Sequence, residues 1–99
     1  MKIIFLPQAK VELLDAIADY EAASGGLGQR FKDEANRCIL WIAEHHELYR
    51  LRPQGYRRIN LRVFPFHILF ITRGSKLWIL AVAHGSRKPE YWIDRGKSL

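Results

Sequence analysis

The residues best suited to chemistry lie close together near the C-terminal end of the chain. Six side chains that can carry charge, transfer a proton or stack on a ligand fall within nine positions: His84, Arg87, Lys88, Glu90, Tyr91 and Trp92. They follow an apolar run typical of a buried strand, and the end of a strand holds side chains firmly while leaving their tips accessible. This cluster predicts an anionic ligand or a protein partner.

Metal-free cleavage of RNA is one reaction that these residue types could support. It needs a base for the 2′-hydroxyl, a cation to stabilise the phosphorane and an acid for the leaving oxygen. His67 or His84 could be the base or the acid, and Tyr91 could donate a proton. The candidate cations are Arg62, Arg73 and Arg87. The same residues equally fit structural roles, as a solvated sheet face and as cover for the core.

Binding without catalysis is the alternative use of these side chains. Tyr91 and Trp92 would then be aromatic anchors of a protein interface, in which a few large side chains supply most of the affinity. The charge for such an interface would come from Arg57, Arg58, Arg62, Arg87 and Lys88. Composition does not distinguish this interface from one that binds RNA.

Several other chemistries lack their motifs. His45 and His46 are adjacent and cannot face the same way on a helix, and neither H-x-x-x-H nor C-x-x-C occurs, so we expect no metal site. Gly85 and Ser86 do not form the G-x-S-x-G elbow of serine hydrolases, and no glycine pattern cradles phosphate. We therefore expect neither a metal nor another cofactor.

Length and charge limit the class of protein further. The 99 residues predict one domain over positions 1–99, and the single cysteine, Cys38, excludes an intrachain disulfide and suggests a small core residue in a reducing compartment. Sixteen Lys and Arg against ten Asp and Glu give a net charge of +6, and from Arg50 onward only Glu90 and Asp94 oppose the basic residues. The apolar start is too short for a signal peptide or a membrane span, so we expect a cytoplasmic protein.

Hydrophobic periodicity predicts the elements that position these residues. A short apolar strand stops at Pro7, which suits a helix start, and two helices joined by Ser24, Gly25 and Gly26 form an antiparallel hairpin. We expect strands at 3–6, 57–63, 67–72 and 76–84 and helices at 9–23 and 28–47. Alternation along 57–63 gives that strand one wet face with Arg58 and Arg62. The order predicts an α+β domain, in which an N-terminal strand and a three-stranded antiparallel meander form a mostly antiparallel sheet and the helical hairpin packs on one face of it.

The chain from Ile3 to Arg95 resembles the RelE/ParE superfamily of toxins from type II toxin-antitoxin modules, often described as plasmid stabilisation proteins. The resemblance is carried by a basic strand, a Phe-Pro-aromatic bend and a last strand that ends in His-Gly-x-Arg or a close variant, followed by Pro, Trp and Arg. Here these features are Arg57-Arg58, then Phe64-Pro65-Phe66-His67, then His84-Gly85-Ser86-Arg87-Lys88-Pro89 with Trp92 and Arg95.

The resemblance implies a toxin that a cognate antitoxin neutralises by wrapping over it. The superfamily contains both ribosome-dependent messenger RNA nucleases and ParE proteins that poison DNA gyrase. The nuclease branch usually carries an arginine after an aromatic residue on the middle strand, where this chain has His67 after Phe66. This difference favours gyrase as the target.

The resemblance to ParE proteins predicts two binding surfaces. We expect Arg57, Arg58 and Arg62 to bind the antitoxin and His84, Arg87, Lys88, Tyr91 and Trp92 to bind the target. Truncation after Pro89 should then abolish toxicity and leave the helical hairpin largely intact. Two alternatives are a RelE-like nuclease that uses His67, Arg62, Arg73, His84, Arg87 and Tyr91, and a non-toxic domain that only binds its antitoxin.

Overall fold

A computed structural model describes residues 1–99 and confirms the α+β fold and the predicted order of elements. The strands and helices are β1 (Lys2–Phe5), α1 (Pro7–Ala23), α2 (Leu27–His45), β2 (Arg57–Asn60), β3 (Phe66–Arg73) and β4 (Lys76–His84). Two short 3-10 helices, η1 (His46–Leu48) and η2 (Ile93–Gly96), follow α2 and β4. Neither α1 nor α2 is both long enough and apolar enough to cross a membrane.

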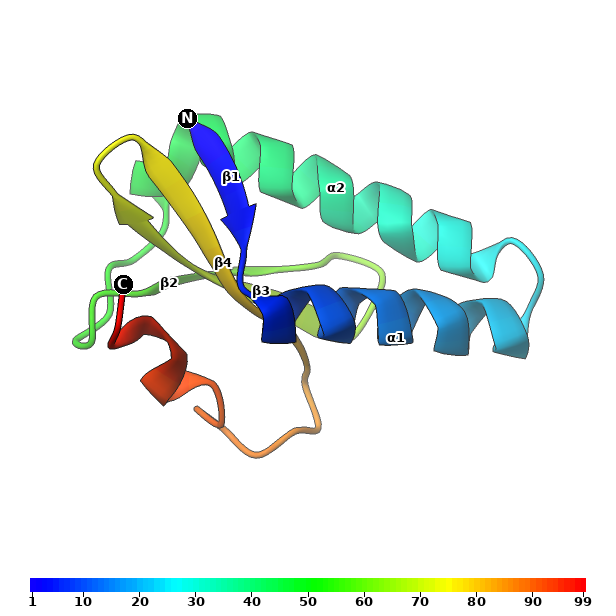
Figure 1. The fold of residues 1–99 in the computed structure, drawn as a ribbon. Coiled ribbons are helices and arrows are strands. Elements are labelled where there is room, and N and C mark those ends of the chain that lie inside the picture. The colour runs from blue at the N-terminus through cyan, green and yellow to red at the C-terminus, as the bar shows by residue number, and fades with distance from the viewer.

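The four strands form one sheet in the order β1-β4-β3-β2. β1 runs parallel to β4, and the other two pairs are antiparallel. β3 and β4 are joined by Gly74 and Ser75, and Gly74 has a φ of 60°, a conformation that glycine adopts without steric cost. The helical hairpin covers one face of the sheet, and the C-terminal segment 85–99 crosses the other (Figure 1).

The helices contact the sheet through one side of each. Pro7 occupies the first turn of α1, where its missing N–H costs no hydrogen bond. α1 buries small residues with one leucine (Ala9, Leu13 and Ala16), whereas α2 buries larger ones, including Phe31, Ile39 and Ile42. Val11 and Leu14, which share an apolar arc with Leu13 in the sequence, are exposed because α1 faces the sheet through only part of that arc.

The two helices approach each other most closely at Gly28. A Cβ atom on Gly28 would lie 2.5 Å from the carbonyl oxygen of Ile17 and 2.9 Å from the Cβ of Glu21. The Gly28 N–H also donates to the Glu21 carboxylate at 3.0 Å. The sequence pattern that ends α1 and begins α2 therefore includes a glycine that the packing itself requires.

We expect Gly28→Ala to lower the free energy of unfolding by about 1 to 3 kcal/mol, because the backbone carbonyl of Ile17 cannot move aside cheaply. Urea denaturation followed by circular dichroism measures the change. Gly25→Ala is the matched control, since nothing lies within 4 Å of a Cβ there. Equal stability of the two variants would contradict the close approach.

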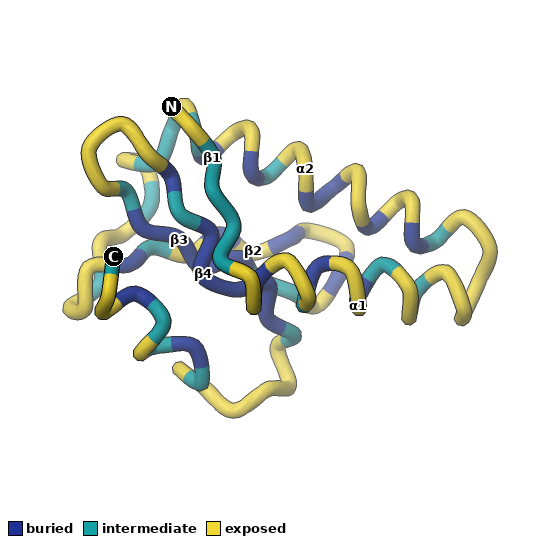
Figure 2. The backbone as a smooth tube through the Cα atoms, viewed as in Figure 1, coloured by how far each residue is buried: buried dark blue, intermediate teal, exposed yellow.

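Side chains pack on both faces of β3 and β4, as their near-continuous apolar sequences predict. The middle of each of these two strands is buried (Figure 2). The larger cluster joins both helices to the sheet through Ile68, Phe70 and Ile79. The smaller cluster on the opposite face contains Tyr56, Leu69, Ile71, Leu80, Ala81, Ala83 and Trp92. A register shift beside Leu69 and Phe70 turns two consecutive residues of β4, Leu80 and Ala81, toward this second cluster.

Candidate functional site

Positive charge gathers in a cavity of about 240 Å³ on the sheet face that the C-terminal segment crosses. We call it the basic cleft and define it by Arg52, Arg58, His67, Arg87 and Lys88. Tyr56, Ala83 and Trp92 also line it and are buried, whereas Glu90, its one carboxylate, is exposed. The cleft brings together basic side chains from four separate parts of the chain.

Regular structure holds most of these side chains in place. Arg58 lies on β2 opposite Leu69, and His67 lies on β3 opposite Ala83. The Arg52 N–H donates to the carbonyl of Tyr56 at 2.9 Å, which closes the turn before β2. Arg52 is a site residue that the sequence interpretation missed, because only this turn carries it to the strand ends.

The electrostatics of the cleft act most clearly on His67. Burial lowers the pKa of its imidazole, and the nearby charges of Arg58 and Arg52 lower it further. His67 is therefore neutral at physiological pH, beside arginines that remain charged. Such a group can accept a proton or a hydrogen bond while its neighbours attract an anion.

His84, the last residue of β4, also lines the cleft. Its ring meets the Phe66 ring edge-on, with centroids 5.0 Å apart. Its Nδ1 atom accepts the Ser86 N–H at 2.9 Å and lies 2.7 Å from the Ser86 hydroxyl oxygen. His84 thus orders the turn at residues 85–88, which is exposed along its length.

A network anchored on α1 holds the C-terminal segment. The two carboxylate oxygens of Glu12 accept one N–H each from the Arg95 guanidinium, at 2.9 and 3.1 Å, and also the Tyr91 hydroxyl. The Val82 N–H donates to the same carboxylate at 3.1 Å. Arg95 further donates to the carbonyl of Leu80, at the irregular point of β4. These bonds connect α1, β4 and the C-terminus.

The sequence left Trp92 either as an aromatic anchor of an interface or as cover for the core, and in the structure it covers the core. Only 4% of Trp92 is exposed, and its ring packs edge-on against Tyr56 with centroids 4.6 Å apart. Tyr91 is half-buried, with its hydroxyl bonded to Glu12 and the Arg87 guanidinium 4.0 Å from its ring centroid. Trp92 is buried because the second face of β3 and β4 needs an apolar cover, so the exposed part of the predicted target surface is residues 85–90.

Tyr91 should titrate unusually late. Burial, followed by the hydrogen bond to Glu12, raises the pKa of its hydroxyl to about 12. The folded chain therefore holds this proton more tightly than the unfolded chain, whose tyrosine pKa is near 10. The stabilisation is complete below pH 10 and should be lost as the pH rises toward 12.

We expect absorbance titration of tyrosinate to show a late step near pH 12 that disappears in Tyr91→Phe. The fall in unfolding free energy between pH 10 and 12 should also be smaller in that variant. Burial raises the pKa of Tyr20 too, so the difference between the two proteins isolates Tyr91. An unchanged late step would contradict the bond to Glu12.

The six residues considered for RNA cleavage do not form one site. His67, His84, Arg87 and Tyr91 line the cleft. Arg73 lies at the other end of β3, opposite Lys76, and Arg62 lies beside α2. The predicted cations other than Arg87 therefore cannot act together with the histidines.

The predicted strand 57–63 is also corrected, because β2 ends at Asn60. The Glu34 carboxylate accepts the backbone N–H groups of Arg62 and Val63, at 2.7 and 3.3 Å, and thereby turns the chain toward α2. Arg58 and Arg62 consequently lie in different pockets, not on one wet face. Arg57 is half-buried, and its Nε donates to the carbonyl of Tyr49 at 3.0 Å.

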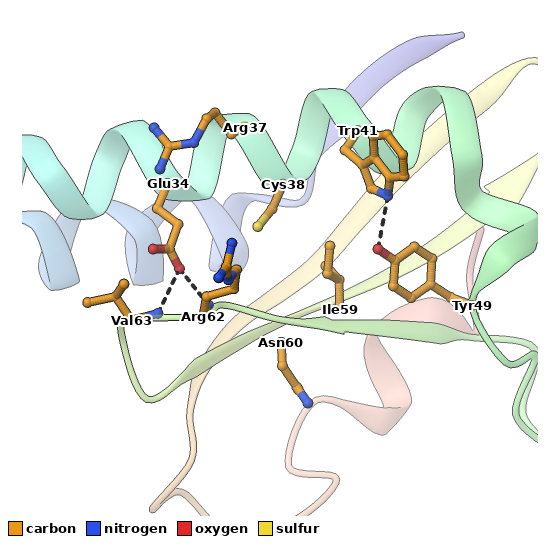
Figure 3. A pocket seen from close by; sticks show the side chains of 9 residues that line it. All are labelled: Glu34, Arg37, Cys38, Trp41, Tyr49, Ile59, Asn60, Arg62 and Val63. Atoms are coloured by element: carbon orange, nitrogen blue, oxygen red, sulfur yellow. Dashed lines mark hydrogen bonds between the residues drawn. The ribbon is translucent and has the colours of Figure 1, made fainter.

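A second hollow, of about 700 Å³, separates α2 from β2, the edge strand (Figure 3). We call it the α2–β2 groove; its lining is Glu34, Arg37, Cys38, Trp41, Tyr49, Ile59, Asn60, Arg62 and Val63. Trp41 is 46% exposed, Val63 is 68% exposed, and the Trp41 indole N–H donates to the Tyr49 hydroxyl at 3.0 Å. The groove thus combines apolar surface, two arginines and a strand edge whose outer side has no partner.

Cys38 lies in this groove and is half-buried. Burial raises the pKa of its thiol, and the carboxylate of Glu34 raises it further, although Arg37 acts in the opposite direction. Nowhere in the chain do three or more histidine, cysteine or acidic side chains form a group that could hold a metal ion.

Comparison with known proteins gives one family match and one match to a solved structure. Residues 3–89 match the family described as the ParE toxin of the type II toxin-antitoxin system, parDE. A solved structure described as the chromosomal ParDE TA system from P. aeruginosa has a TM-score of 0.74 at 18% sequence identity, over 85% of this chain and 95% of that one. No curated protein matches the chain. At this identity, the structural match supports the fold.

Proposed function

The chain belongs to the ParE toxin family of type II toxin-antitoxin systems, and on this premise we propose that it arrests growth by binding DNA gyrase and is neutralised by a cognate antitoxin. The observation that carries the proposal is the family match over residues 3–89. The separation of Arg62 and Arg73 from the histidines supports binding over RNA cleavage.

The gyrase contact is proposed for the exposed turn after β4. Residues 85–90 are all exposed, and the hydrogen bonds between Ser86 and His84 order this turn. Arg87 and Lys88 provide charge there, whereas Trp92 contributes by packing beneath the segment. A positively charged, ordered turn favours rapid encounter with an acidic protein surface.

Expression of the chain alone in a bacterial host tests this function. We expect growth arrest, an induced DNA-damage response and intact messenger RNA in primer extension. Co-expression of the protein encoded beside its gene should restore growth. Cleaved messages without a DNA-damage response would favour a nuclease, and normal growth would leave only a binding domain.

The antitoxin is proposed to occupy the α2–β2 groove. An extended segment could pair with the free edge of β2, place apolar side chains against Trp41 and Val63, and direct acidic ones toward Arg37 and Arg62. Such a segment gains from neutralising these charges as it folds. This moves the predicted antitoxin site from Arg57 and Arg58 to the groove, with Arg62 retained.

We expect Arg62→Glu to weaken antitoxin binding by about tenfold or more, because it places a negative charge against an acidic segment. Toxicity should persist, and co-expressed antitoxin should no longer restore growth fully. Arg73→Glu is the matched control, since Arg73 is exposed at the far end of β3. Calorimetry with purified antitoxin measures both affinities, and equal loss in the two variants would exclude the groove.

A further inference from the structure

The basic cleft contains more positive charge than the fold uses. Arg52, Arg58, Arg87 and Lys88 line it against a single carboxylate, that of Glu90. None of these four cations belongs to an ion pair, because the three salt bridges of the structure lie elsewhere. Like charges repel when they share one cavity, so an anion bound among them would relieve this repulsion.

The guanidinium groups in the cleft are partly fixed, and one of their nitrogen atoms has no partner within the fold. The Nε atom of Arg52 is buried and has no hydrogen-bond partner. The Arg87 guanidinium rests 4.0 Å from the centroid of the Tyr91 ring, which limits the positions that it samples. Arg58 and His67 project from neighbouring strands. Planar guanidinium groups held in this way match the oxygens of a phosphate, to which arginine can donate two parallel hydrogen bonds.

The lining favours a nucleic-acid strand over an acidic peptide. Three of the apolar residues that line the cleft, Tyr56, Ala83 and Trp92, are buried, so they offer little surface to anchor a peptide. The exposed anchors, Trp41 and Val63, lie in the α2–β2 groove instead. Binding of a phosphate backbone depends mainly on charge, which is what the cleft provides.

We propose that the basic cleft binds the phosphodiester backbone of a nucleic-acid strand through Arg52, Arg58, Arg87 and Lys88. His67 takes part as a neutral neighbour whose ring becomes easier to protonate when a phosphate offsets the two arginines. This binding is separate from the proposed contact with gyrase and does not require gyrase. The cleft recognises phosphate independently of base sequence.

Fluorescence anisotropy with a labelled single-stranded DNA oligonucleotide tests the proposal on the full chain. The double variant Arg58→Gln, Lys88→Gln removes two exposed cations of the cleft, and Lys32→Gln, Lys76→Gln removes two exposed cations elsewhere. We expect the first to weaken binding by about tenfold or more at low salt and the second by about twofold or less. The slope of log affinity against log salt should become less negative by about 0.7 for each lost contact only in the first.

RNA of the same sequence shows which source of backbone the cleft accepts. Equal binding means that it accepts either, and a preference identifies the source. Circular dichroism confirms that both double variants fold. A nuclear magnetic resonance titration of the His67 ring, with inorganic phosphate as the probe, should move its pKa upward. Equal losses of oligonucleotide affinity in the two double variants, together with an unchanged His67 pKa, would overturn the proposal. If the chain still arrested growth when expressed alone, the proposed function would be unaffected by that result.

Discussion

Replacing Glu12 with alanine is expected to lower the free energy of unfolding by about 3 kcal/mol, because it removes the acceptor that holds the C-terminal segment. The change leaves the Arg95 guanidinium, whose side chain is 17% exposed, without its carboxylate. It also removes the acceptor of the Tyr91 hydroxyl and of the Val82 N–H. Arg95, Tyr91 and Val82 thus lose their shared hydrogen-bond acceptor at once.

Urea denaturation measures this change, and hydrogen exchange locates it. Exchange should accelerate most at residues 91–99, since the bonds to Glu12 are the polar link between that segment and α1. Asp19→Ala is the control, because this exposed acid on α1 takes part in no ion pair, and its loss should change stability by less than about 0.5 kcal/mol. Similar effects of the two substitutions would contradict the network.

Truncating Trp92 to alanine should cost about 3 to 5 kcal/mol, the range for loss of a large buried aromatic side chain. Trp92 fills the second face of the sheet with Tyr56, Leu80 and Ile71. A cavity would remain there, because the strands beneath are also packed against the helices and cannot collapse into it.

Trp41→Ala provides the comparison for that experiment. Trp41 is 46% exposed and makes one side-chain hydrogen bond, to Tyr49, so its loss should cost about 1 kcal/mol or less. Circular dichroism is the suitable signal, since both substitutions alter the fluorescence. If Trp92→Ala were as stable as the parent and only lost affinity for a target, Trp92 would belong to an interface.

A truncation after Pro89 would destabilise the fold as well as remove a predicted target surface. The sequence suggested that the truncation would remove a target surface and leave the helical hairpin intact. In the structure it would remove Trp92, Tyr91 and Arg95, and with them the cover of one sheet face and the bonds to α1. Loss of toxicity in that truncation would therefore report loss of stability as well. Substitutions at Arg87 and Lys88 test the surface more cleanly, because both side chains are exposed.

Local patterns predicted most of the fold. β4 was predicted with its observed bounds, because turn residues flank an unbroken apolar run on both sides. The end of α1 at Ala23 was also predicted, from Ser24, Gly25 and Gly26, whereas the helix begins at Pro7 and not at the predicted Ala9. Turn chemistry and hydrophobic period depend on neighbours in sequence, so they can be read without the tertiary structure.

Contacts between distant residues account for the predictions that were wrong. β2 stops at Asn60 because Glu34, 28 positions before Arg62, takes the backbone donors that would continue the strand. The sequence could not decide whether Trp92 is an interface anchor or cover for the core, because the register shift that turns both Leu80 and Ala81 toward the second core leaves no mark in the sequence. Arg52 joins the basic cleft only through a turn closed with Tyr56. Charge and residue type identified the candidate residues, and packing decided which of them face the solvent.

The proposed action on gyrase is tested most directly with purified components. The chain is added to DNA gyrase and relaxed plasmid, and supercoiling is followed on a gel with and without the antitoxin. We predict that the chain stops supercoiling and that cleaved plasmid accumulates, and that equimolar antitoxin reverses both effects. Full supercoiling in the presence of excess chain, with messenger RNA cut on purified ribosomes by the same preparation, would contradict the account.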